Sequence, residues 1–315
     1  ALIFLITLAL VMFTKTLTRL YTTKRYRELK KNYEYWFELR RQALTSDDPE
    51  KGKALAKNID KLNVPFVSTH VMTTAFYGLH PLVFRSGQLA NDQTAVGNVK
   101  GILARPDLKD RTYYVLVHDY SWGHDAGERF IALAKEKGIK IHNEKYDKAP
   151  IKTKDWSSYI SKIKASGVDG VYMAFITNVI PVFAKQAADF GLQANGVKLV
   201  SAAAPGPLEL EAGGEACHGI FGASEWSWDV NTPTSDAWEM AFWKKYNTIP
   251  SDAAAHSYVG AMNLFKAIEK AGSTDPEKVI ASWEGHTFDF FNQPMYMRPD
   301  DHQVIADRPI SVLEF

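Results

Sequence analysis

The stretch TYYVLVHDYSWGHDAGERFIALAKEKG, residues 112–138, decides the fold class of this protein. It opens with a run of aromatic and aliphatic residues that is typical of a strand buried on both faces. A segment rich in helix formers follows and stops at Gly138. We therefore expect a strand over 112–119 and a helix over 125–138, with Asp125 as its N-cap.

The same alternation of strands and helices extends in both directions from this stretch and predicts an α/β fold with parallel sheets covered by helices on both faces. Ligands bind such sheets at the carboxyl ends of the strands. The loops of interest are therefore STHVMTT, HDYSWGHD, FITN and SAAAPGP. The expected strands are 64–68, 139–146, 170–176 and 198–202, and the expected helices are 53–62, 91–103, 156–167 and 178–191.

Composition narrows the class of protein further. The chain has 315 residues, of which 46% are hydrophobic, enough for two lobes rather than one. The net charge of +1 gives no general reason to expect a nucleic-acid partner. The single cysteine, Cys217, excludes an internal disulfide and a multi-cysteine metal site.

No motif of a hydrolase, zinc protease, dinucleotide-binding or Walker-type enzyme appears in the loops, so we expect a protein without catalysis or cofactor. The segment HDYSWGHD, residues 118–125, gathers two histidines and two aspartates but lacks a helical i, i+4 ligand pair. We interpret it as helix capping and loop packing rather than a metal site.

The first 44 residues differ from the rest in composition. The run ALIFLITLALVMF, residues 1–13, is apolar, and the segment 15–41 carries nine Lys or Arg against three Glu, a net charge of +6. We predict a transmembrane-like helix that continues into a basic helix on lipid headgroups or a protein partner. A cleavable signal and an ordinary solvated helix stay open as alternatives. Basic residues next to a membrane helix usually lie on the cytoplasmic side of the membrane. The basic segment 15–41 therefore conflicts with an extracytoplasmic location for the rest of the chain.

Several stretches between residue 54 and the end resemble one family in their order. They are VPFVSTHVMTT with PLVFRSG, TYYVLVHDYSWGHDAGERF, VDGVYMAFITNVIPVFAKQAADFGL, and PSDAAAHSYVGAMNLFKAIEKAGSTDPEKVIASWEG with the closing Asp301–Gln303. The chain resembles the type I periplasmic binding proteins that serve branched-chain amino acid, amide and aromatic-acid ABC importers.

The resemblance implies two α/β lobes joined by three crossings near 106–111, 226–233 and after residue 300, with a ligand held between the lobes. We expect lobe one to comprise 54–106 and 233–298, and lobe two 111–228 and 309–315. In the family about a hundred further residues precede this part. We expect lobe one to be incomplete here, with the anchor-like segment in their place.

The resemblance also places candidate binding residues. Family members hold a ligand carboxylate after the first of these strands, at positions that match His70 and Met72, and Ser68, Thr69, Thr73 and Thr74 lie close enough to substitute. Trp122 matches the aromatic residue that forms one wall of the family's ligand-binding cleft. Ala203 stands where amino-acid binders carry a carboxylate for the ammonium group, which favours a ligand other than a zwitterion. The predicted ligand-binding residues are Ser68, Thr69, Thr73, Thr74, Tyr120, Trp122, Thr177, Asn178, Glu225 and Trp226. For Glu225 and Trp226, packing between lobes is an equal alternative.

These observations predict a membrane-anchored solute receptor of the bacterial periplasm or cell envelope. Its ligand would be a small organic molecule, aromatic or aliphatic and either uncharged or carrying a carboxylate, that it delivers to an ABC importer. An alternative is an accessory or scaffolding subunit of a membrane complex that reuses the fold and binds no solute. In both hypotheses residues 1–44 contact membrane lipid or a membrane protein complex, and nucleic acid is not a partner.

Overall fold

The computed structural model describes residues 65–70, 72, 80–86, 90–229, 232–291 and 293–306, and the backbone of 311–314. The chain divides into two units, residues 1–55 and 56–315, and the described residues lie in the second. The predicted membrane segment 1–44, the predicted helix 53–62, Thr73 and Thr74 therefore lie outside the described residues. None of the described helices combines the length and hydropathy of a membrane-crossing segment.

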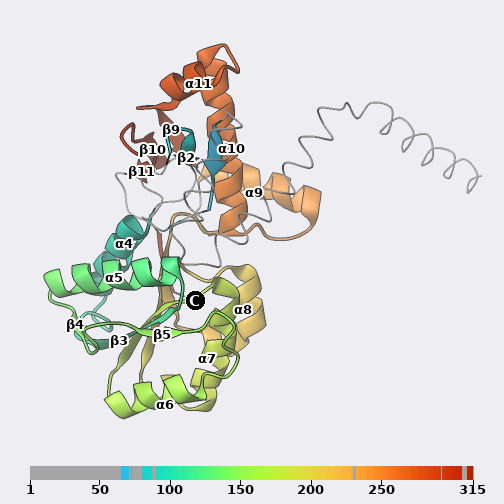
Figure 1. The fold of residues 1–315 in the computed structure, drawn as a ribbon. Coiled ribbons are helices and arrows are strands. Elements are labelled where there is room, and N and C mark those ends of the chain that lie inside the picture. Colours follow the sequence, from blue (N-terminus) through green and yellow to red (C-terminus); the bar gives the residue numbers. More distant parts are fainter. Residues whose placement is uncertain are drawn as a thin grey trace, which may run out of the picture. The chain divides into compact units, whose positions relative to one another are not determined.

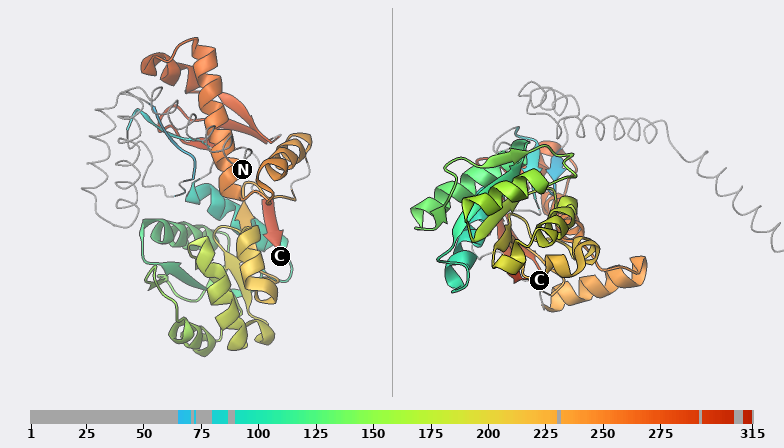
Figure 2. Two further views of the ribbon diagram at one scale, coloured as in Figure 1. Left: turned by 90° about the vertical axis from the view of Figure 1, so that its right-hand side faces the viewer. Right: turned by 90° about the horizontal axis from the view of Figure 1, so that it is seen from below.

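A seven-stranded sheet forms the larger group of elements, in the order β12-β8-β7-β6-β3-β4 with β5 also paired to β3. All pairings are parallel except that of β12 with β8. Figure 2 shows the C-terminal strand β12, in red, alongside the yellow part of the chain that contains β8. The strands are β3 (Thr112–His118), β4 (Lys140–Ile141), β5 (Asp147–Ala149), β6 (Gly170–Ala174), β7 (Lys198–Ser201), β8 (Phe221–Ser224) and β12 (Ser311–Glu314).

Helices cover both faces of this sheet because the side chains of its central strands point alternately into two hydrophobic cores, one on each face. In β3, Tyr114 and Leu116 face one hydrophobic cluster, whereas Tyr113, Val115 and Val117 face the other. The first cluster is closed by α6 and α7, and the second by α4 and α5; α5 and α6 lie on opposite sides of the sheet in Figure 1. The helices are α4 (Asn91–Ala104), α5 (Ser121–Glu136), α6 (Ser157–Ser166), α7 (Ile180–Asp189) and the short α8 (Pro207–Gly213).

A smaller group of elements has its own core. Its strands are the parallel pair β1 (Phe66–Ser68) and β2 (Val83–Arg85) and the antiparallel set β9 (Thr287–Phe290), β10 (Gln293–Met297) and β11 (Val304–Ala306). Its helices are α9 (Pro233–Tyr246), α10 (Asp252–Ala271) and α11 (Pro276–Trp283). Phe84 is stacked between Trp283, at 4.3 Å between ring centroids, and His302, at 4.0 Å.

Two of the motifs that carried the family resemblance meet in this core. Arg85, in the PLVFRSG segment, is buried and donates from Nε to the side-chain oxygen of Gln303. Its backbone N–H donates to the carbonyl of His302 over 2.8 Å. The closing Asp301–Gln303 segment is therefore the hydrogen-bonding partner of β2, and burial of the Arg85 guanidinium depends on it.

The structure corrects two expectations within the predicted α/β architecture, the start of α5 and the length of the strand after it. Helix α5 begins at Ser121 rather than after Asp125, because Gly123 has no Cβ, and a Cβ there would lie 2.2 Å from the carbonyl oxygen of His118. Helix α4, which we predicted to belong to lobe one, packs against α5, β8 and β12 of the large sheet, and the lobe boundaries stay a prediction. The strand expected over 139–146 is limited to β4, and the antiparallel set β9–β11 was not predicted.

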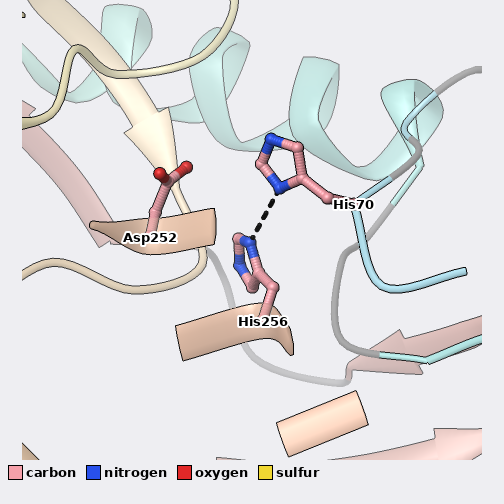
Figure 3. Close-up of side chains that lie close together, drawn as sticks. All are labelled: His70, Asp252 and His256. Atoms are coloured by element: carbon pink, nitrogen blue, oxygen red, sulfur yellow. Dashed lines mark hydrogen bonds between the residues drawn. The ribbon is translucent and has the colours of Figure 1, made fainter. Parts of the chain in front are cut away.

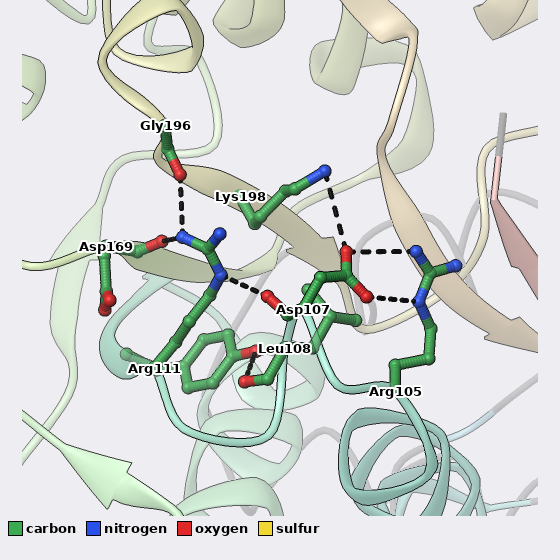
Figure 4. A network of polar contacts seen from close by, with 8 residues as sticks. Arg105, Asp107, Leu108, Arg111, Asp169, Gly196 and Lys198 are labelled. Carbon is green, nitrogen blue, oxygen red and sulfur yellow. Dashed lines mark hydrogen bonds and ion pairs between the residues drawn. The ribbon is translucent and has the colours of Figure 1, made fainter.

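An arginine ties together the loops that precede three parallel strands (Figure 4). The guanidinium of Arg111 donates to the carbonyl oxygens of Asp169, at 2.6 Å, and Gly196, at 2.7 Å, and also to that of Asp107. Asp107 in turn pairs with Arg105 at 3.0 Å and with Lys198 at 3.7 Å, and hydrogen bonding to Arg105 is the main cause that lowers the pKa of Asp107. This network holds the amino ends of β3, β6 and β7, opposite the edge expected to bind ligand.

We expect Arg111→Ala to lower the free energy of unfolding by about 1 to 3 kcal/mol, because three backbone carbonyls lose a charged donor that is only partly solvated. Urea unfolding followed by circular dichroism measures this loss. The matched control is Arg129→Ala, whose side chain is 51% exposed and pairs with Asp125 within α5; it should cost under about 1 kcal/mol. Equal losses in the two variants would contradict the role assigned to Arg111.

A buried histidine stands at the carboxyl end of β3. His118 is 0% exposed, packs against the rings of Trp156 and Phe175, and accepts the N–H of Ile176 at Nδ1 over 3.0 Å. Burial lowers its pKa from 6.5 to about 4. The folded protein therefore holds this imidazole neutral at pH values at which the unfolded chain protonates it.

Because the folded pKa lies below the unfolded one, the stability contributed by His118 is fully present above about pH 6.5 and is lost as the pH falls toward 4. The loss amounts to at most about 3 kcal/mol. We expect His118→Gln to show a shallower decline of unfolding free energy between pH 7 and pH 4.5 than the unmodified chain, measured by urea unfolding at several pH values. Parallel declines would show that His118 does not carry this dependence.

Candidate functional site

The predicted binding loops leave one edge of the large sheet. Strands β3, β6, β7 and β8 are parallel, so their carboxyl ends lie at the same edge. The segments that follow them contain, in order along the chain, Tyr120 and Trp122, Thr177 and Asn178, Ala203, and Glu225 and Trp226. The edge therefore gathers most of the predicted binding residues into neighbouring loops.

Two aromatic rings begin helix α5. Tyr120 is its N-cap and Trp122 lies in its first turn; both are half-buried, with ring centroids 5.9 Å apart. Burial raises the pKa of the Tyr120 phenol, which therefore stays protonated and able to donate a hydrogen bond. Together the rings offer an apolar surface with a polar tip, the kind of surface that a small apolar or aromatic molecule packs against.

The next loop is held to the first through His118. The N–H of Ile176 donates to Nδ1 of His118, and Thr177 and Asn178 follow in a 3-10 turn over Thr177–Val179. Thr177 is half-buried and Asn178 is exposed. Their hydroxyl and amide groups thus stand at the same sheet edge as Tyr120 and Trp122, on a loop fixed by a buried side chain.

Asn91 joins the loop after β1 to the start of α5. Its N–H donates to the carbonyl of Met72 over 2.7 Å, and its side-chain amide donates to Asp125 at 2.8 Å and to the carbonyl of Trp122 at 3.4 Å. Two of the predicted binding loops, far apart in sequence, therefore meet at one residue. From the sequence we placed this residue at the start of the helix expected over 91–103 and missed its bridging role.

The loop after β1 packs closely against helix α10. Ser68 is buried, its carbonyl accepts the N–H of Ser86 over 3.0 Å, and the hydroxyl of Thr69 lies 3.2 Å from that of Ser257. A Cβ on Gly260 would lie 2.5 Å from both the Ser86 carbonyl oxygen and Cγ2 of Thr69. The hydroxyls of this loop are therefore positioned by a glycine contact with α10.

Glu225 and Trp226 are both buried, and their contacts differ. A carboxylate oxygen of Glu225 lies 3.6 Å from Nε2 of His256. The indole N–H of Trp226 donates to the hydroxyl of Ser235 over 2.7 Å, and its ring packs edge-on against Trp238 at 5.4 Å. With 1% of its surface exposed, Trp226 has the contacts of the packing alternative, whereas Glu225 lies beside a polar cluster through its contact with His256.

That polar cluster consists of His70, Asp252 and His256 (Figure 3). The Nδ1 atoms of the two imidazoles lie 3.4 Å apart, and one potential ligand atom from each residue falls within 4.8 Å of the others. Burial lowers the pKa of His256 well below its ordinary value, and His70 adds to this effect. Burial raises the pKa of Asp252, against the opposing effect of His70. Sequence reasoning singled out His70 by position and missed the other two.

The profile of the periplasmic binding protein family matches residues 49–314. A leucine-, isoleucine-, valine-, threonine- and alanine-binding protein of Pseudomonas aeruginosa is 29% identical over 212 residues, which cover 67% of this chain and 54% of that protein. A Leu/Ile/Val-binding protein homolog of Brucella abortus is 25% identical and covers 77% of this chain and 62% of that protein.

Solved structures have the same fold. A solute-binding protein of an ABC transporter from Rhodopseudomonas palustris, in complex with p-hydroxybenzoic acid, superimposes with a TM-score of 0.73 at 23% identity, over 84% of this chain and 72% of that one. A leucine-binding protein of Thermotoga maritima gives a TM-score of 0.70 at 21% identity, over 85% and 74%.

The chain spans about half the length of the first curated relatives that it matches, 54% and 51%. The family match nevertheless covers most of its residues and includes the loops that build the candidate site. The resemblance drawn from the sequence is thereby confirmed, and the chain belongs to the periplasmic binding protein family.

Proposed function

We propose that this chain is the solute-binding receptor of an ABC importer, acting in the periplasm or cell envelope and binding a small organic molecule. The observation that carries the proposal is the meeting of two binding loops at Asn91, which contacts the Met72 carbonyl and, through its side chain, the Trp122 carbonyl. A receptor needs loops from distant parts of the chain to converge on one solute. Family membership supports the same function.

For the lobes that would enclose the solute, we propose the predicted boundaries with one change. We propose lobe one as 54–90 with 233–298, and lobe two as 91–228 with 309–315. Helix α4 moves to lobe two because it packs on the large sheet. The first crossing then precedes Asn91, so the residue that joins the loops stands where the chain passes from one lobe to the other.

The proposed ligand has an apolar or aromatic body and a carboxylate. Tyr120 and Trp122 supply the wall, and the hydroxyls of Ser68 and Thr69 supply donors for the carboxylate. Ala203 offers no counter-charge for an ammonium group, and the Glu225 carboxylate stands beside His256. Among relatives, the Pseudomonas protein is named for amino acids and the Rhodopseudomonas structure contains p-hydroxybenzoic acid. The site favours the second class.

Thermal unfolding in the presence of 4-hydroxybenzoate, benzoate or leucine tests this choice. At a concentration of one hundred times Kd, a true ligand adds about 2.7 kcal/mol of stability. We expect the aromatic acids to raise Tm and leucine to leave it unchanged. Leucine as the best stabiliser would overturn the ligand class while leaving the receptor function in place.

Titration calorimetry with the stabilising acid tests the aromatic wall. We expect Trp122→Ala to weaken binding at least about tenfold, because stacked aromatic contact is worth about 1 kcal/mol beyond the buried area. The matched control is Trp243→Ala, a tryptophan of α9 that is 48% exposed; it should bind as the unmodified chain does. Unchanged affinity in Trp122→Ala would remove this residue from the site.

Gly260→Ala tests whether the α10 contact positions the hydroxyl loop. A glycine-to-alanine change in an unobstructed helix adds up to about 1 kcal/mol of stability. Here the new Cβ would strike Thr69 and the Ser86 carbonyl, so we expect a net loss of about 1 to 3 kcal/mol and weaker solute binding. Glu269→Ala, exposed on the same helix, is the control. If Gly260→Ala instead raised the free energy of unfolding in urea, the loop would be able to move away from the new Cβ, and the α10 contact would not position it.

A further inference from the structure

The cluster of His70, Asp252 and His256 combines two parts of the chain that are 182 to 186 residues apart. Asp252 is the first residue of α10 and His256 lies one turn further along, so the i, i+4 spacing puts both side chains on one face of the helix. His70 comes from the loop after β1 and reaches the same point. Figure 3 shows the two imidazoles facing each other, with the carboxylate beside them.

The separation of the imidazole nitrogens matches that of two ligands on one metal ion. Zinc–nitrogen bonds are about 2.0 to 2.1 Å long, and two of them at a tetrahedral angle place the nitrogens about 3.3 to 3.4 Å apart. The Nδ1 atoms of His70 and His256 lie 3.4 Å apart. A carboxylate oxygen of Asp252 lies within 4.8 Å of one ring nitrogen of each histidine and supplies the third possible ligand.

Glu225 stands behind His256 in the position of a second-sphere partner. Its carboxylate oxygen lies 3.6 Å from Nε2, the nitrogen that faces away from His70. A carboxylate at this place favours the proton on Nε2 and leaves the lone pair of Nδ1 directed at the cluster. Metal-bound histidines are commonly oriented by a carboxylate in this way.

The three side chains of the cluster differ in solvent exposure. His256 is 0% exposed, Asp252 is half-buried and His70 is exposed. An ion held by these three residues would therefore have the buried His256 on its inner side. At least one of its coordination positions would be open to solvent. Zinc sites with three protein ligands and one exchangeable position have this form.

We propose that His70, Asp252 and His256 bind a divalent transition-metal ion of the Zn²⁺ class, with Glu225 orienting His256. Two imidazoles and one carboxylate select such ions over Ca²⁺ and Mg²⁺, which prefer oxygen ligands in larger number. Within the described part of the chain, this is the one group of three or more possible metal ligands that lie together. The proposal stands independently of the solute-binding function.

Metal titration of the full chain tests the site. The protein is freed of metal with a chelator, and ZnCl₂ or CoCl₂ is added without any organic solute. We expect one ion per chain in calorimetry, with the visible absorption bands of tetrahedral Co²⁺, and no binding of Ca²⁺. A chain that binds no Zn²⁺, or that binds Ca²⁺ equally tightly, would overturn the proposal and leave the solute-binding proposal untouched.

Variants then assign the ion to these residues. His70→Ala removes an exposed side chain, and Asp252→Asn keeps an oxygen for the Ala253 N–H, which Asp252 accepts over 2.7 Å. We expect each to weaken Zn²⁺ binding at least about tenfold, and Glu225→Gln to weaken it about 10- to 100-fold. His218→Ala, an exposed histidine beyond η4 (Gly214–Cys217), should bind as the unmodified chain does. Wild-type affinity in His70→Ala would disprove the assignment.

Discussion

Strand β3 has water on neither face, and this constraint shapes most of the larger part of the molecule. Its side chains from Tyr113 to Val117 are at most 3% exposed and alternate between two separate cores. A strand buried on both faces needs a layer of helices on each, and these helices require crossover connections that keep the strands parallel. Polar side chains are then left to the strand ends. The arrangement confines donors such as Thr177 to one edge, where a ligand can reach them.

The sequence predicted the parts of the fold whose signal is local. The apolar runs of β3 and β6 and the glycine stop at Gly138 are visible without any tertiary information. The start of α5 was missed because it depends on a contact across the turn, the close approach of Gly123 to the His118 carbonyl. Strand β10 was missed although its residues alternate in burial, since Pro294 lies within it and proline usually argues against a strand.

The candidate site, too, has parts that could be predicted from the sequence and parts that could not. The loops at the sheet edge were predictable, because strand polarity fixes where they emerge. The bridging residues were not. Asn91 has the sequence context of a helix start, and its contacts with Met72 and Asp125 arise only from folding. Asp252 and His256 likewise sit in an ordinary helix opening, and His70 meets them across 186 positions of sequence.

Strand β12, and not the buried strand β8, forms one edge of the large sheet. Residues 311–314 run antiparallel to β8, so Phe221 and Gly222 are paired on both sides, with β7 and with β12, and Ala223 and Ser224 are paired with β12. Without this last strand, a row of unpaired N–H and C=O groups on an apolar strand would face solvent and template pairing with other chains. Pairing with β12 thus satisfies the outward-facing backbone groups of the buried strand β8 and moves the edge of the sheet to residues 311–314.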